Sequence, residues 1–183
     1  MKKGKFVIIS GPSGVGKDTI CNELVKKRVG RYSVSMTTRK KRSNEIEGIS
    51  YFFVSKEEFE RHIEENYFLE YAMYNGNYYG TPNEFIKETT NNGNNVIAVL
   101  EIKGAINAKR IFSNAITIFI MPPSFDELER RLRGRKSEDD NIISERLNIA
   151  KEEIKYKDKY DYVVINNTVD EAVLEIENII NNC

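Results

Sequence analysis

The chain has 183 residues, a length typical of a single domain. Lys and Arg together number 28 and Asp and Glu together number 28, so the formal net charge is zero and no overall basic field favours nucleic acid or a membrane surface. With 40% hydrophobic and 31% charged residues, the composition is that of a globular protein with a well-hydrated surface. Two cysteines and one histidine exclude a disulfide framework and zinc-ligand spacing.

The first residues do not form a targeting signal. A few basic residues are followed by only five apolar or small ones, FVIIS at 6–10, before Gly11 and Pro12, which is too short for a signal peptide or a membrane span. We therefore expect a protein of the reducing cytoplasm that binds neither nucleic acid nor membranes, and nothing in the sequence implies an obligate protein partner.

Apolar runs of strand length alternate with amphipathic stretches along the whole chain. The apolar runs predict strands at 5–10, 32–35, 51–54, 68–74, 77–79, 96–102, 116–121 and 162–165. Helices are expected at 16–28, 55–65, 81–91, 104–112, 124–133, 143–154 and 168–181. Continuous apolar strands separated by helices indicate an α/β fold, a parallel sheet covered by helices on both faces. The polar, aromatic stretch 37–79 interrupts this pattern and is expected to form a small β-rich insert.

Helix starts are marked by hydroxyl residues that precede an acid by three positions. Ser55, Thr81 and Thr168 each begin such a capping box, and Ser124 is expected to cap the helix that follows it. Pro82 would then occupy the first helical position after Thr81.

The sharpest motif follows the first strand and opens the first helix. It consists of Gly11, Pro12, Ser13, Gly14, Val15, Gly16 and Lys17, the pattern of a phosphate-binding loop in its proper context. Its backbone N–H groups would bind phosphates at the positive end of the helix dipole, and Lys17 would reach the β- and γ-phosphates. Asp18 stands where the pattern has Ser or Thr as a Mg²⁺ ligand. A carboxylate is also a hard oxygen ligand, but it brings negative charge close to the phosphates.

Nearly the whole chain resembles the guanylate kinases. The matching segments are GPSGVGK (11–17), SVSMTTRKKR (33–42), GISYFFVS (48–55), FLEYAMYNGNYYGTP (68–82), FIMPPS (119–124), RLRGR (131–135) and YDYVVIN (160–166). The resemblance implies a P-loop kinase that transfers the γ-phosphoryl group of ATP to GMP with Mg²⁺. It also implies one domain in three parts: a core (1–32, 84–133, 158–183), a GMP-binding insert (33–83) and a mobile lid (134–157).

A basic loop and two tyrosines are candidates for binding the phosphate of GMP. Arg39 and Arg42 present the paired donors that suit a phosphate monoester, and Tyr51 and Tyr79 supply hydroxyl donors. By resemblance, these four and Ser35 hold the GMP phosphate. Taken alone, the basic run at 39–42 is also compatible with an ordinary solvated loop.

Glu70 and Thr81 are the candidates for reading the base. A carboxylate only accepts hydrogen bonds, and the guanine edge offers N1–H and an amino group, whereas adenine presents an acceptor at N1. The resemblance assigns this contact to Glu70 and a contact with guanine O6 to Thr81. Glu70 could instead be an exposed strand charge, and helix capping alone would also account for Thr81.

Arginines flank a charged segment, 134–140, that lacks an apolar anchor and is expected to be mobile. Arg131 and Arg135 are one helical turn apart, and Arg146 follows the segment. The resemblance makes Arg135 and Arg146 lid residues that bind phosphate and, with Lys17 and Arg39, catalytic residues. It places Asn166, after the last strand, beside the adenine of ATP.

The segment 100–105 departs from the family. Guanylate kinases usually read Leu-[Asp/Glu]-Ile-Asp-Val-Gln-Gly-Ala, and here two residues and the second acid are missing. Glu101 stays a candidate for contacting GMP and for orienting Mg²⁺ through water, while Lys103 cannot replace an acid. Asp18 is the other candidate metal ligand.

The sequence thus predicts a magnesium-dependent guanylate kinase that needs no catalytic base. Two alternatives stay open: a related P-loop kinase acting on a sugar phosphate such as ribose 1,5-bisphosphate, and a non-catalytic guanylate-kinase-like interaction module.

Overall fold

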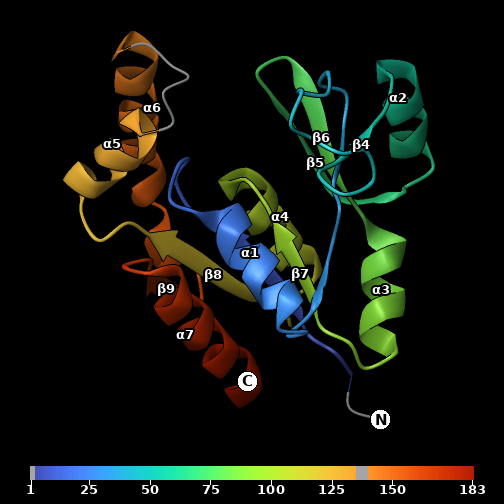
Figure 1. Cartoon of the computed structure of the whole chain (residues 1–183). Helices are drawn as coiled ribbons and strands as arrows, with labels where there is room; N and C mark the ends of the chain where they lie inside the picture. The colour runs from blue at the N-terminus through green and yellow to red at the C-terminus, as the bar shows by residue number, and fades with distance from the viewer. Residues whose placement is uncertain (1–2, 135–139) are drawn as a thin grey trace.

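A parallel sheet forms the centre of the computed structural model, which describes residues 3–134 and 140–183 (Figure 1). In these residues the main sheet has five strands in the order β2-β7-β1-β8-β9. Every neighbouring pair of these strands is parallel. The strands are β1 (Phe6–Ser10), β2 (Arg31–Tyr32), β7 (Val96–Val99), β8 (Ile116–Met121) and β9 (Tyr162–Ile165).

Helices bury both faces of the main sheet. Alternate side chains of each strand point to opposite faces, so each strand contributes apolar residues to both layers. Val7 and Ile9 of β1 pack with residues of α1 (Lys17–Lys26) and α7 (Val169–Asn182). Phe6 and Ile8 pack on the other face with residues of α3 (Asn83–Asn91) and α4 (Ile102–Ile111). The predicted parallel α/β sheet with helices on both faces is confirmed.

A second, smaller sheet lies between β2 and α3 in the sequence. Within the described chain it has four strands in the order β4-β3-β6-β5. The strands are β3 (Met36–Thr37), β4 (Phe52–Phe53), β5 (Phe68–Tyr74) and β6 (Asn77–Pro82). The helix α2 (Lys56–Glu64) anchors to this sheet through Phe59, whose ring stacks on those of Phe68 and Tyr78 at centroid distances of 4.3 and 5.1 Å. The predicted β-rich insert is therefore present.

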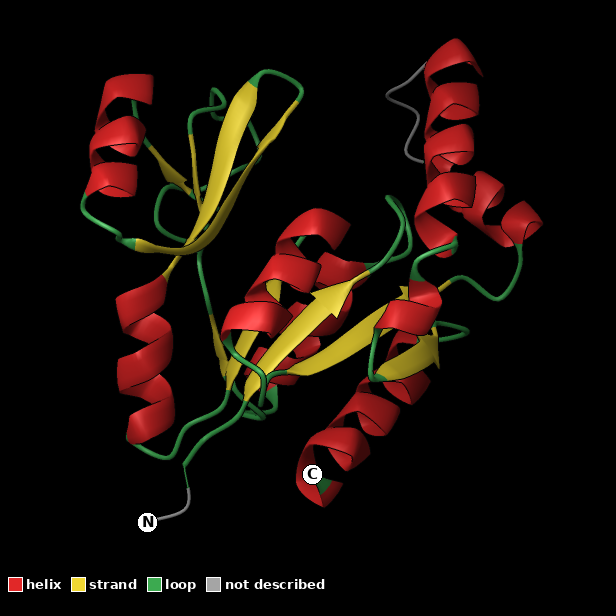
Figure 2. Cartoon of the chain, turned by 180° about the vertical axis from the view of Figure 1, so that it is seen from behind, coloured by secondary structure: helices red, strands yellow, loops and turns green. Residues whose placement is uncertain are grey.

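Two helices form a third part of the molecule. The helices α5 (Phe125–Arg133) and α6 (Asp140–Ile154) share a small apolar cluster of Leu128, Leu132, Ile143 and Ala150. A short 3-10 helix, η1 (Lys157–Lys159), leads from α6 to β9. Figures 1 and 2 show α5 and α6 on one side of the main sheet and the second sheet with α2 on the other, both at the same end of the molecule.

Three of the four predicted helix caps are confirmed. Ser55, Ser124 and Thr168 each accept a hydrogen bond from the backbone N–H three residues later, at 3.1, 3.1 and 3.3 Å. The prediction for Thr81 is wrong: β6 extends through Pro82, which is the N-cap of α3 and makes no side-chain cap bond. The hydroxyl of Thr81 has another partner, described below.

Some strand boundaries also differ from the prediction. The expected strand at 32–35 is divided, because β2 ends at Tyr32 and pairs with β7, whereas β3 begins at Met36 and belongs to the second sheet. The strand expected at 96–102 ends at Val99, and α4 begins two residues earlier than expected, at Ile102. In the segment 100–105, only Leu100 and Glu101 therefore lie between β7 and α4.

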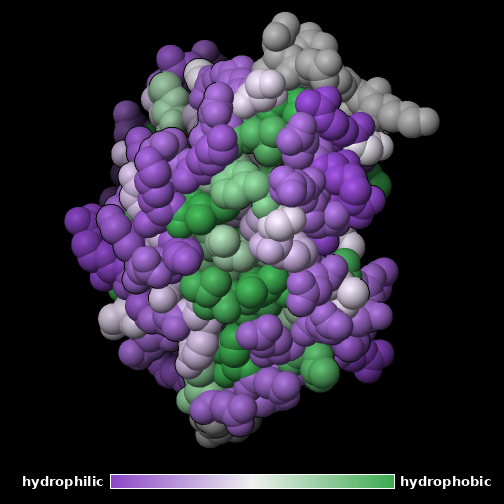
Figure 3. Space-filling view, turned by 90° about the vertical axis from the view of Figure 1, so that its left-hand side faces the viewer, coloured by the Kyte–Doolittle hydropathy of each residue, from purple (hydrophilic) through white to green (hydrophobic). Residues whose placement is uncertain are grey.

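β9 is an edge strand and part of its surface is apolar. Tyr162, Val163 and Ile165 are exposed, on the side of the molecule where Figure 3 shows a band of apolar surface.

Among the described residues, no helix is both long and apolar enough to cross a bilayer.

Candidate active site

The phosphate loop connects β1 to α1. Gly11, Gly14 and Gly16 have φ angles of 146°, 86° and 98°, which only glycine adopts without strain, so the loop conformation depends on them. The Nζ of Lys17 donates hydrogen bonds to the carbonyl oxygens of Gly11 (2.5 Å) and Pro12 (3.1 Å). The amine is thus held over the loop, where it can exchange carbonyl partners for phosphate oxygens.

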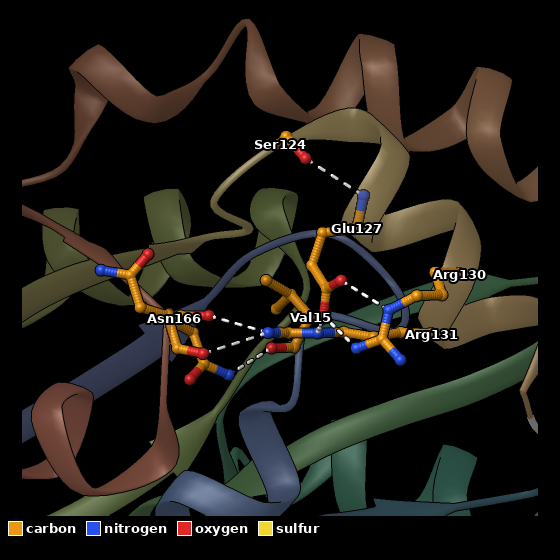
Figure 4. A network of polar contacts seen from close by, with 7 residues as sticks. Val15, Ser124, Glu127, Arg130, Arg131 and Asn166 are labelled. Carbon is orange, nitrogen blue, oxygen red and sulfur yellow. Dashed lines mark hydrogen bonds and ion pairs between the residues drawn. The ribbon is translucent and has the colours of Figure 1, made fainter.

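A polar network ties this loop to β9 and α5 (Figure 4). Asn166 is only 3% exposed, and its Nδ2 donates to the carbonyl of Val15 at 2.7 Å. Arg131 donates to the backbone carbonyl of Asn166 at 3.0 Å and to Glu127 at 2.8 Å. The Oδ1 of Asn166 is buried without a hydrogen-bond partner among the described residues. Asn166 thus lies against the loop, with one acceptor unused.

Of the two lid arginines, Arg135 and Arg146, the structure describes only Arg146. Arg135, together with the rest of 135–139 in the segment expected to be mobile, lies outside the described residues. Arg146 is on α6 and acts electrostatically on Tyr74 at the end of β5. Burial and then Glu101 raise the pKa of Tyr74, and Arg146 opposes them. The charge of Arg146 therefore acts on the second sheet.

Three of the five candidate ligands of the GMP phosphate, Arg39, Tyr51 and Tyr79, lie close together at the second sheet. The guanidinium carbon of Arg39 lies 5.6 Å from the ring centroid of Tyr51, and the rings of Tyr51 and Tyr79 are 5.9 Å apart. Ser35 precedes β3, and its carbonyl accepts the backbone N–H of Phe52 in β4. Arg42 has an exposed side chain.

Glu70 and Thr81 face each other across β5 and β6. Thr81 Oγ1 donates to Glu70 Oε1 at 2.7 Å, which is why Thr81 is not available as a helix cap. Burial raises the pKa of Glu70 despite this hydrogen bond. A Cβ on Gly104, in the first turn of α4, would lie only 2.6 Å from Glu70 Oε2, so the carboxylate uses space left by a glycine.

Asp18 and Glu101 are the candidate Mg²⁺ ligands, and they could hold the ion only together with other ligands. Among the described residues, no group of three or more His, Cys, Asp or Glu side chains could hold a metal. Asp18 is exposed in the first turn of α1, and its charge, after burial, helps to raise the pKa of Tyr51 to about 12. Since protein-bound Mg²⁺ usually has one or two carboxylates plus phosphates and water, exposed carboxylates at Asp18 and Glu101 fit such a site.

Sequence reasoning missed a carboxylate at the phosphate loop. Glu153, near the end of α6, is half-buried, and its Oε2 is buried without a hydrogen-bond partner among the described residues. Burial and then Glu101 raise its pKa, while Lys17 and the Ser13 N–H oppose the rise. Glu153 follows the apolar stripe of α6, and no motif marked it. Glu45, which binds Arg39, was missed as well, because no motif marked it.

A parallel sheet with a phosphate loop after its first strand, and a second sheet that carries the candidate phosphate-binding and base-reading residues, is the arrangement of a P-loop phosphotransferase. The fold is shared with the shikimate kinase of Bacteroides thetaiotaomicron (TM-score 0.51, 12% identity, 97% of this chain and 98% of that one).

The comparisons identify the family. The guanylate kinase family model matches residues 3–183. Guanylate kinases of Halalkalibacterium halodurans and Clostridium acetobutylicum are 46% and 48% identical over 98% of this chain and 88% and 86% of their own lengths. The crystal structure of guanylate kinase from Anaplasma phagocytophilum has a TM-score of 0.83 at 34% identity, covering 99% of this chain and 86% of that one. The chain belongs to the guanylate kinase family, as its sequence predicts.

Proposed function

We propose that the phosphate loop binds the donor and the second sheet selects the acceptor. As a guanylate kinase, the chain transfers the γ-phosphoryl group of ATP to GMP, giving ADP and GDP. The observation that carries the division of roles is the Glu70 carboxylate, which is largely buried and held by Thr81 in the second sheet. A buried acceptor of this kind favours a base edge with two adjacent N–H donors.

On the donor side, the amides of 11–18 bind the phosphates of ATP, and Lys17 moves from the loop carbonyls to the β- and γ-phosphates. Asn166 lies beside the adenine, and its buried Oδ1 has no hydrogen-bond partner among the described residues. Arg135 and Arg146 bind phosphate from the lid and balance the charge that develops in transfer.

On the acceptor side, Ser35, Arg39, Arg42, Tyr51 and Tyr79 hold the phosphate of GMP, and Glu70 accepts the N1–H and amino hydrogens of guanine. Thr81 has one hydroxyl proton, and in this structure Glu70 receives it. Thr81 therefore orients Glu70, and it contacts guanine O6 as a donor only when this proton turns away. Glu101, before α4, is close enough to this region to act on Tyr51 and Tyr74 and contributes to binding GMP.

Mg²⁺ would be held by the phosphates of ATP with Asp18 and, through water, Glu101. When bound, it would neutralise phosphate charge. In the transfer, an oxygen of the GMP phosphate attacks the γ-phosphorus, and the bond from that phosphorus to the β,γ-bridging oxygen breaks. The attacking oxygen needs no base because it is already ionised. Lys17 and Arg39 orient the two phosphates in line and offset their mutual repulsion.

We also assign these roles to three parts of the chain: a core (1–32, 84–133, 158–183), a GMP-binding insert (33–83) and a lid (134–157). The second sheet and α2 fall within the bounds of the insert and α6 within those of the lid, whereas α5, which packs on α6, falls within the core. We further propose a cytoplasmic location, where both nucleotides are available, and no partner beyond these two substrates.

An assay of ADP release with different acceptors tests the proposal. We expect turnover with GMP and little with AMP, UMP or ribose 1,5-bisphosphate, because only guanine offers paired donors to Glu70. Lys17→Ala should lower kcat/KM by about a hundredfold or more with an unchanged circular dichroism spectrum. Preference for the sugar phosphate would overturn the acceptor assignment, and absence of turnover with every acceptor would favour an interaction module.

A further inference from the structure

Arg39 is held by a carboxylate that the motif did not mark. Its Nη2 donates to Glu45 Oε1 at 2.6 Å and its Nη1 donates to Glu45 Oε2 at 3.1 Å, a two-point contact between guanidinium and carboxylate. Nη1 also donates to the backbone carbonyl of Lys40 at 2.8 Å. The side chain of Arg39 is therefore fixed before any phosphate binds.

The geometry of these bonds leaves one edge of the guanidinium for a ligand. A guanidinium has five N–H donors in a fixed plane. Glu45 takes one from each terminal nitrogen, and Lys40 takes the second hydrogen of Nη1. The two donors that these three contacts do not use are Nε–H and the second hydrogen of Nη2, which lie on the same side of the plane. Together they form the paired donor that suits two oxygens of one phosphate.

The surroundings keep Arg39 and Glu45 in this arrangement. Their side chains are 17% and 13% exposed, so water competes weakly for the pair. The guanidinium lies 5.6 Å from the ring centroid of Tyr51 and 5.8 Å from that of Phe53. Glu45 also accepts the backbone N–H of Arg42 at 2.8 Å, which fixes the loop that carries both arginines.

The pKa shifts of Glu45 and Arg39 both favour the charged forms of the two side chains, as expected for an ion pair. Burial acts to raise the pKa of Glu45, but the hydrogen bonds from Arg39 and the Arg42 amide outweigh it, and the pKa is lowered. The pKa of Arg39 is raised, chiefly by its hydrogen bond with Glu45, and the hydroxyl of Tyr79 adds to the rise. Tyr79, another proposed phosphate ligand, thus acts on the same guanidinium.

We propose that Glu45 is a positioning residue that fixes the guanidinium of Arg39 so that its free edge binds the phosphate of the acceptor nucleotide. This inference rests on the proposed role of Arg39. It is distinct from an arrangement in which Glu45 occupies the place of the phosphate and has to be displaced. The two arrangements predict opposite changes in the affinity for GMP. Removal of a positioning group weakens GMP binding, and removal of a competitor strengthens it.

Glu45→Gln tests the inference, because it keeps the shape of the side chain and replaces one acceptor by a donor that cannot pair with a guanidinium N–H. We expect the KM for GMP to rise about tenfold or more, while the KM for ATP stays within about twofold of the wild-type value. Guanosine lacks the phosphate, so its inhibition constant should not change. A purely structural defect would weaken both ligands.

Glu47→Gln is the matched control. Glu47 is in the same loop, and its carboxylate accepts the backbone N–H of Phe53 without touching Arg39. It should leave the KM for GMP close to that of the wild type. An equal rise in this control would mean that both acids only order the loop, and the inference would be wrong.

A double-mutant cycle with Arg39→Ala separates the inference from the proposed function. If Glu45 acts through Arg39, Glu45→Gln has no further effect on GMP affinity in the Arg39→Ala background. Loss of affinity in Arg39→Ala but unchanged or tighter binding in Glu45→Gln would overturn only the role of Glu45. Unchanged affinity in Arg39→Ala would overturn the proposed phosphate site and this inference with it.

Discussion

Glu70 illustrates how single residues set the chemistry of the acceptor site. Its carboxylate is an acceptor in a largely buried position, where an unpaired charge is costly. The only side-chain donor recorded for it in the described residues is Thr81. Two adjacent donors on a purine would relieve that cost, and a base with an acceptor in the same place would add to it.

Gly104 is the second residue that this site requires, because it leaves room for the carboxylate of Glu70. We expect Gly104→Ala to fold about as stably as the wild type, since Ala in a helix is favoured over Gly by roughly 0.5–1 kcal/mol, which offsets the loss of the Thr81–Glu70 hydrogen bond, about 1 kcal/mol. The added Cβ would meet Glu70 Oε2 at 2.6 Å, so the flexible carboxylate has to turn away. The KM for GMP should therefore rise about tenfold.

Thermal unfolding and the ratio of kcat/KM for GMP and IMP, which lacks the amino group, measure the two effects of Gly104→Ala. The GMP preference should fall while the melting temperature is kept. Lys103→Ala, on the exposed side of the same helical turn, is the control. An unchanged preference in Gly104→Ala would contradict the role assigned to this space.

The phosphate loop could be predicted from its motif and the candidate GMP ligands from their resemblance to family segments, because each is a short stretch of consecutive residues. Glu45 and Gly104 could not be found in this way. Their importance lies in contacts with Arg39 and Glu70, and one sequence does not record which side chains meet in space. Thr81 was found but given a wrong local role as a cap, because its real partner is on the neighbouring strand.

At the scale of elements, β9 and α5 support the phosphate loop. Arg131 of α5 holds the carbonyl of Asn166 after β9, and the Asn166 side chain holds the carbonyl of Val15 (Figure 4). Alternating apolar runs and caps predicted these elements well. The link between them could not be predicted, since it depends on the end of β9 reaching the loop across the sheet.

Asn166→Ala should loosen the phosphate loop without disturbing the acceptor site. It removes a buried hydrogen bond, for which we expect a loss of about 1 kcal/mol of stability. The KM for ATP should rise about tenfold, and the KM for GMP should stay nearly unchanged. Urea unfolding and steady-state kinetics measure the two effects. Asn167→Ala is the control, because only its backbone carbonyl contacts Arg131; an equal change there would contradict the role of Asn166.

On the scale of the whole molecule, charges from two other parts of the chain act on the pKa of Tyr74. This residue is at the end of β5, and the charges that act on it come from Glu101 before α4 and from Glu153 and Arg146 of α6. The phosphates of two nucleotides would enter the region between these parts. We therefore expect the second sheet and α6 to approach each other when both substrates bind.

A single tryptophan at this position reports such an approach, since the chain has no Trp of its own. Tyr74 is 50% exposed, so Tyr74→Trp should emit as a largely hydrated indole in the free protein. We expect its emission to shift to shorter wavelength with GMP and a non-hydrolysable ATP analogue together, and much less with either alone. Tyr162→Trp, on the edge strand β9, should not respond. A full shift with one nucleotide would contradict closure by the pair.

The path of the chain through the second sheet has an evolutionary consequence. The segment leaves the main sheet after β2 and returns into α3, and its first and last strands, β3 and β6, are hydrogen-bonded neighbours with Met36 opposite Gly80. A segment whose ends lie side by side can be exchanged for another without stretching the framework that carries it. A descendant of such an enzyme can thus acquire a new acceptor by replacing one stretch of chain, while the machinery that handles ATP is inherited intact.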